Sequence, residues 1–97
     1  MNREQADKII EVIKTGATGR GAFFPDRVAA CIIGDLFLAA GYERSDAEHL
    51  LIPEMVLTQY PFLSLLRYNQ LVDTNDAHRT VGRRRRALIA LVEGWVE

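Results

Sequence analysis

The stretch Val28–Ala40, VAACIIGDLFLAA, is the longest nearly apolar run of the chain and decides the expected fold. Its thirteen residues contain one charged side chain, Asp35. A helix that is apolar on nearly every side packs against several neighbours, and thirteen residues are well short of the ~20 that cross a bilayer. We therefore expect no membrane span but a buried central helix, which begins at Pro25 and is ended near Ala40 by Gly41 as its C-cap.

The sequence before this run predicts an amphipathic helix over residues 2–15. Its apolar residues recur at steps of three and four, the spacing of one helix face. Asn2 and Gln5 have the spacing of a capping box, in which each side chain bonds the backbone of the other residue. Three glycines in GATGRG, residues 16–21, end this helix because each glycine loses much backbone entropy inside one.

The sequence after Gly41 predicts further short helices. Ser45 and Glu48 form a second capping-box pattern. Pro53 either separates two helices or kinks a single one, since proline removes a helical hydrogen bond. Polar residues 73–75 are expected to end a helix, and residue 75 or 76 is expected to cap the last one. The expected helices span 46–52, 53–59, 62–72 and from about 76 to 96.

No segment combines sustained alternation with β-branched residues, so we expect an all-α fold. The fold is predicted to be a small compact bundle or orthogonal array of five to six short helices around the central apolar helix. Ninety-seven residues are enough for one hydrophobic core, and we expect a single helical domain over residues 1–97.

The charge balance weakens the simplest argument for a nucleic-acid or membrane-surface protein, a strongly basic chain. Twelve Lys and Arg stand against thirteen Asp and Glu, for a net charge of −1. The only cysteine, Cys31, has no partner for an internal disulfide, and the charged first fifteen residues do not resemble a signal peptide. We therefore expect a cytoplasmic protein.

The arginine run 83–86, with Arg79 one turn earlier, is the strongest polar feature of the chain. Arginine binds phosphates and carboxylates well, so Arg79, Arg83, Arg84 and Arg86 are the candidate residues for a partner or an anion. The alternative is a solvated face that is paired with acids elsewhere in the fold. Helical geometry places Arg79, Arg83 and Arg86 on one side with Ala90, Glu93 and Glu97, and Arg85 on the opposite side with Val81, Leu88, Val92 and Trp95.

Arg85 differs from its neighbours because it falls on the apolar side of this helix. A buried guanidinium requires a partner, and Asp35 is the only acid of the central apolar helix. We therefore expect a structural ion pair between Asp35 and Arg85, with a ligand-binding carboxylate in a pocket as the less favoured interpretation.

The other polar residues do not match a known catalytic or metal-binding pattern. The glycines of residues 16–21 lack the spacing and the preceding strand of a phosphate loop. His49 and His78 are not spaced as metal ligands, and Cys31 lies within an apolar helix, where thiols usually pack as small hydrophobes. We expect no catalytic residues, no metal and no cofactor.

These observations favour a small non-enzymatic helical module for protein interaction or regulation. Its partner is expected to be another protein or a second copy in a homodimer. The alternative is a nucleic-acid-binding domain that uses the C-terminal arginine-rich helix, which the net charge does not favour. An enzyme with a small pocket around Asp35 and Arg85 is a third class, because fold alone does not exclude activity.

Overall fold

The computed structural model describes residues 1–19, 31–48 and 52–97, and the regular structure within these ranges is helical. This confirms the predicted all-α class. None of the helices in the described ranges combines the length and the apolar character needed to cross a membrane. The elements are α1 (Arg3–Thr15), α2 (Ile32–Ala39), the 3₁₀ helix η1 (Arg44–Glu48), α3 (Ile52–Gln59), α4 (Leu65–Ala77) and α5 (Val81–Glu93).

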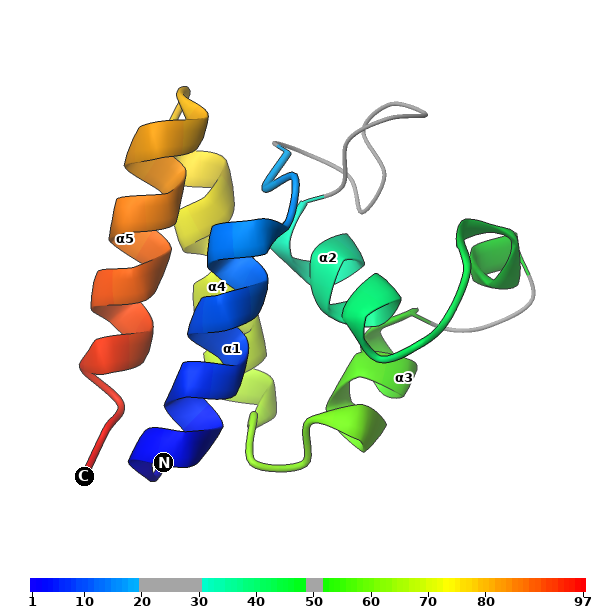
Figure 1. Cartoon of the computed structure of the whole chain (residues 1–97), viewed down its shortest axis with the longest axis horizontal. Helices are drawn as coiled ribbons and strands as arrows, with labels where there is room; N and C mark the ends of the chain where they lie inside the picture. Colours follow the sequence, from blue (N-terminus) through cyan, green and yellow to red (C-terminus); the bar gives the residue numbers. More distant parts are fainter. Residues whose placement is uncertain (20–30, 49–51) are drawn as a thin grey trace.

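Helices α1, α4 and α5 stand side by side, and α2 and α3 lie on one flank of this group (Figure 1). α5 packs against α4 and α1, whereas α2 packs against α1, α3 and α4. The two ends of the chain meet, since the backbone N–H of Glu97 donates to the carbonyl of Met1 at 3.0 Å. The apolar α2 thus contacts three other helices, as expected of a helix that is apolar on nearly every side.

The core is built around α2, and its members from α1 and α5 follow the spacing of one helix face. Burying each large apolar side chain contributes about 1.5–3 kcal/mol, which makes this cluster the main stabilising feature. Among its fully buried members are Ile32, Ile33, Leu36 and Phe37 of α2, Ile9 and Ile13 of α1, and Leu88 and Val92 of α5.

The central helix is shorter at its start than the apolar run indicates. Cys31 has extended backbone (ψ 177°), so α2 begins at Ile32, and the predicted residues 25–30 lie outside the described part of the chain. At the other end, Gly41 has φ +101° and donates to the carbonyl of Leu38 at 3.0 Å. Glycine suits this left-handed position because it has no Cβ, although Ala40 is the C-cap residue itself.

The helix-start signals were interpreted correctly in α1. Asn2 accepts from the Gln5 backbone N–H at 2.8 Å, and the Gln5 side chain accepts from the Asn2 N–H at 3.1 Å, which forms the expected capping box. Beyond Gly41, residues 44–48 form η1 and not the start of the α-helix expected over 46–52, whose residues 49–51 lie outside the described part of the chain. In η1 the Asp46 carboxylate accepts from the Glu43 N–H at 2.7 Å. Pro53 is in the first turn of α3, where its missing N–H removes no helical bond.

The boundaries of the last two helices correct the predicted ones. α4 begins after Ser64, whose side chain accepts from the Arg67 N–H at 3.2 Å, and it continues through residues 73–75 because Asn75 faces the interior, where it is 1% exposed. α5 is capped by Thr80 and ends at Glu93 rather than near residue 96. The hydroxyl cap of Thr80 thus replaces the amide or carboxylate cap expected for the last helix at residue 75 or 76.

Candidate functional site

The segment 16–19, which follows α1, is held by polar side chains of other helices. Asp35 of α2 is 6% exposed and accepts hydrogen bonds from the backbone N–H groups of Ala17 (3.2 Å) and Thr18 (2.8 Å). Gly16 lies so close that a Cβ built on it would meet the Asp35 carboxylate carbon at 2.5 Å. The carboxylate therefore supplies partners for backbone donors that would be costly to bury unpaired.

Arg84 holds the same segment from α5. Its Nε donates to the carbonyl of Thr18 at 2.8 Å. Its Nη1 donates to the carbonyls of His78 (3.0 Å) and Arg79 (2.8 Å), just before α5 begins. At 7% exposed, this guanidinium is buried among backbone acceptors, so Arg84 is a structural residue and is removed from the candidates for partner binding.

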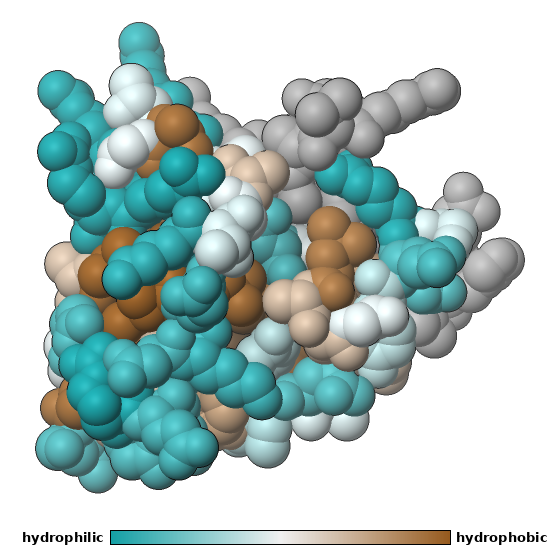
Figure 2. Space-filling model, viewed as in Figure 1, coloured by the Kyte–Doolittle hydropathy of each residue, from teal (hydrophilic) through white to brown (hydrophobic). Residues whose placement is uncertain are grey.

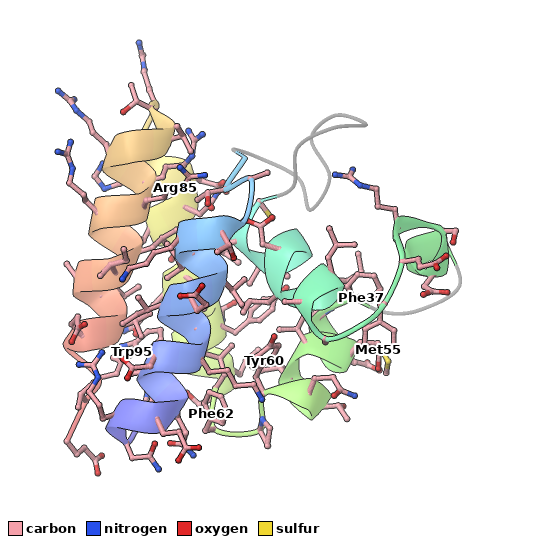
Figure 3. All side chains as sticks on the ribbon, in the orientation of Figure 1. Phe37, Met55, Tyr60, Phe62, Arg85 and Trp95 are labelled. Carbon is pink, nitrogen blue, oxygen red and sulfur yellow. The ribbon has the colours of Figure 1, made fainter. Side chains whose placement is uncertain are left out.

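Arg85 is half-buried and points from α5 towards the end of α1 (Figure 3). Its Nη2 donates to the carbonyl of Gly16 at 2.7 Å, and its buried Nε has no partner among the described residues. Leu88 and Val92 form the buried face of this helix as expected, but the arginine that joins them is Arg84 and not Arg85.

The expected ion pair between Asp35 and Arg85 does not form directly. No ion pair within 4.0 Å joins these two described residues, and each instead bonds the segment that starts at Gly16. Burial raises the pKa of the Asp35 carboxyl to about 6, against the lowering effects of the N–H groups of Thr18 and Ala17 and of the charges of Arg85 and Arg44. Desolvation therefore affects the pKa of this carboxyl more than its hydrogen bonds and the nearby positive charges do.

Asn75 completes this polar cluster and was not predicted to belong to it. Its Oδ1 accepts from the Ile32 N–H at the start of α2 (3.1 Å), and its Nδ2 donates to the Gly19 carbonyl (2.8 Å). The sequence suggested a helix end at this position, because asparagine is common there. The available signal was its spacing of four residues from Leu71, which is also buried.

Arg79, Arg83 and Arg86, which we call the arginine face, are exposed. Figure 3 shows nitrogen-tipped side chains extending from the beginning of α5, and Figure 2 shows a hydrophilic projection at the same end of the molecule. Within the described ranges, no ion pair joins these three guanidinium groups to a carboxylate. Arg83 and Arg86 lie on α5, whereas Arg79 precedes the N-cap Thr80, so the predicted helical position of Arg79 was wrong.

The cysteine and the two histidines were not expected to be catalytic or to bind a metal ion. Cys31 is 4% exposed, and burial raises the pKa of its thiol, which disfavours a reactive thiolate. His78 uses its backbone carbonyl to receive Arg84, and His49 lies outside the described residues. No group of three His, Cys, Asp or Glu side chains in the described part of the chain could hold a metal ion.

Comparison with known proteins adds no relative: no protein-family model matches the chain, and no curated protein and no solved structure is significantly similar to it.

Proposed function

We propose that the protein is a non-enzymatic helical interaction module that binds an acidic segment of a protein through the arginine face of α5. The observation that supports this proposal is that the five arginines at positions 79 and 83–86 differ in their contacts. Arg84 and Arg85 are bonded to backbone carbonyls, whereas Arg79, Arg83 and Arg86 are exposed and without a described carboxylate.

The electrostatics of the arginine face favour a partner with carboxylates. Arg83 and Arg86 are three residues apart on α5, and like charges at this spacing repel by a few tenths of a kcal/mol. Each exposed ion pair contributes only about 0.2–1 kcal/mol, so these charges select and orient an acidic partner more than they hold it.

The use of the buried polar groups supports a non-enzymatic role. Asp35, Asn75 and Arg84 each bond backbone atoms of residues 16–19. A catalytic acid or base needs to reach a substrate atom, whereas these side chains are occupied in holding the chain. A single buried thiol and no second cysteine agree with a reducing compartment, and we propose the cytoplasm.

Nucleic acid is the less favoured ligand of the same face. Asp73 and Asp76, both exposed, lie in the last turns of α4, shortly before Arg79 in the chain. Together with a net charge of −1, these acids oppose the broad positive surface that phosphate binding requires.

The test is an NMR titration with a helical peptide that carries three glutamates at steps of four and three residues, because such a titration detects weak binding. We expect amide shifts concentrated over residues 79–90, and none with the matched glutamine peptide. Arg83→Ala/Arg86→Ala should remove these shifts, whereas Lys8→Ala/Lys14→Ala, which deletes the same charge from the exposed side of α1, should keep them. Equal shifts in the two double variants would contradict the proposal.

A further inference from the structure

The exposed side of α5 carries charges of both signs, positive near its start and negative at its end. Its exposed residues are Gly82, Arg83, Arg86, Ala90 and Glu93, followed by Gly94. This side lies opposite Leu88, which is fully buried. Positive and negative charges are therefore separated along the length of the helix, on the same exposed side.

We propose that the partner that fits this side of α5 is a second copy of the chain, with the two α5 helices packed antiparallel about a two-fold axis that crosses the exposed side at the level of Leu88. This inference rests on the proposed function, because it uses the same arginine face. The axis places Arg83 against the partner's Glu93 and Arg86 against the partner's Ala90. It also places Gly82 against the partner's Gly94, so every contact is repeated by symmetry, as an isologous interface requires.

The small residues on this side allow the two helices to approach. A Cβ built on Gly82 has nothing within 4 Å, so the space above this turn is open. Ala90 faces the partner's Arg86 in this arrangement, and its small side chain leaves room for the long arginine side chain. Thirteen helical residues extend about 20 Å, which gives room for both copies of the Arg83–Glu93 contact.

Existing contacts of Glu93 extend the charge complementarity into a network. Glu93 already pairs with Arg3 through both carboxylate oxygens, and its side chain is 45% exposed. Because a carboxylate has about four acceptor sites, it can receive the partner's Arg83 as well. The opposite charge would also offset the repulsion between Arg83 and Arg86, which are three residues apart on α5.

The expected dimer is weak. A contact between two single helices is smaller than the roughly 1,200–2,000 Å² of a standard interface, and exposed ion pairs are screened by salt. We therefore expect an association that exchanges rapidly, weakens with salt and leaves the arginine face accessible in the monomer.

Sedimentation velocity over a wide concentration range at low salt tests this inference. The wild type should show a weight-average sedimentation coefficient that rises with concentration, and Arg83→Glu or Glu93→Lys should weaken the dimer by about 2- to 30-fold through loss of both symmetric contacts. The double variant R83E/E93K restores opposite charges and should restore the dimer. Because Glu93→Lys also breaks the pair between Glu93 and Arg3, this rescue shows whether the weakening comes from the contact between the two copies or from the loss of that pair. Lys8→Glu, an equal charge reversal on α1, should leave the dimer unchanged.

A wild type that stays monomeric throughout would overturn the inference, and so would a double variant that dimerises no better than Arg83→Glu. The glutamate-peptide titration distinguishes this failure from that of the proposed function. A monomer that still binds the peptide through residues 79–90 excludes only the second copy as the partner.

Discussion

Arg84 donates from Nε to the carbonyl of Thr18, 66 residues earlier in the chain, and Thr18 has φ +50°. This left-handed conformation costs a residue with a Cβ roughly 1–2 kcal/mol. Asp35 bonds the N–H of Thr18 while Arg84 bonds its carbonyl, so both backbone groups of the strained residue are held. The polar cluster thus fixes the chain where it leaves α1.

Arg84→Met should destabilise the fold by roughly 2–4 kcal/mol. The substitution keeps an aliphatic stem but leaves the carbonyls of Thr18, His78 and Arg79 without this donor. Arg83→Met, one residue away and exposed, should change stability by less than about 0.5 kcal/mol. Urea denaturation of both variants measures the difference, and equal midpoints with equal slopes would show that the buried guanidinium does not stabilise the fold.

Gly16→Ala and Gly82→Ala should change stability in opposite directions. A Cβ on Gly16 would meet the Asp35 carboxylate at 2.5 Å, and relieving this contact should cost roughly 1–3 kcal/mol. Gly82 lies in α5 with open space around it, and alanine there should stabilise the helix by up to about 1 kcal/mol. Thermal unfolding followed by circular dichroism gives the two signs; a stabilising Gly16→Ala would mean that the segment is not held against Asp35.

The pH dependence of stability should carry the signature of a buried carboxyl. Burial raises the pKa of folded Asp35 to about 6, above its ordinary 3.8, so the folded chain binds this proton more tightly than the unfolded chain does. The contribution of Asp35 is therefore fully present below about pH 4 and is lost as the pH rises through about 6. Asp35→Asn cannot titrate and provides the reference.

The free energy of unfolding of the wild type, measured relative to Asp35→Asn, should fall as the pH rises from about 4 to about 6. One pKa unit corresponds to about 1.4 kcal/mol, so the total change should not exceed about 3 kcal/mol. A difference that rises over this interval would show that the bonds from Thr18 and Ala17 outweigh desolvation.

Local signals predicted the fold class and the first helix, because capping and periodicity act within a few residues. Asn2 and Gln5 illustrate this, as does the left-handed Gly41. The end of α4 could not be read in the same way. Asparagine is common at helix ends, yet the buried side chain of Asn75 bonds the backbone of Ile32 and of Gly19. These two residues are 43 and 56 positions distant in the chain. Tertiary hydrogen bonds outweighed local preference there.

The candidate site was predictable in part. Helical spacing alone places Arg83 and Arg86 on one side of α5, and both are exposed, whereas Arg79 is exposed but precedes the helix. The roles of the other two arginines depend on where residues 16–19 pass. Because the carbonyl of Thr18 lies beside α5, Arg84 is drawn inward although the apolar pattern favoured Arg85. No periodicity encodes the path of that segment.

The arginine face should bind protein carboxylates and not nucleic-acid phosphates, and a titration with duplex and single-stranded oligonucleotides at two salt concentrations distinguishes these two ligands most directly. We expect only weak binding that salt suppresses. If phosphates were the true ligand, removing one of Arg79, Arg83 and Arg86 would lower the slope of log affinity against log salt by about one unit. A submicromolar complex at physiological salt that disappears in the triple alanine variant would contradict the account.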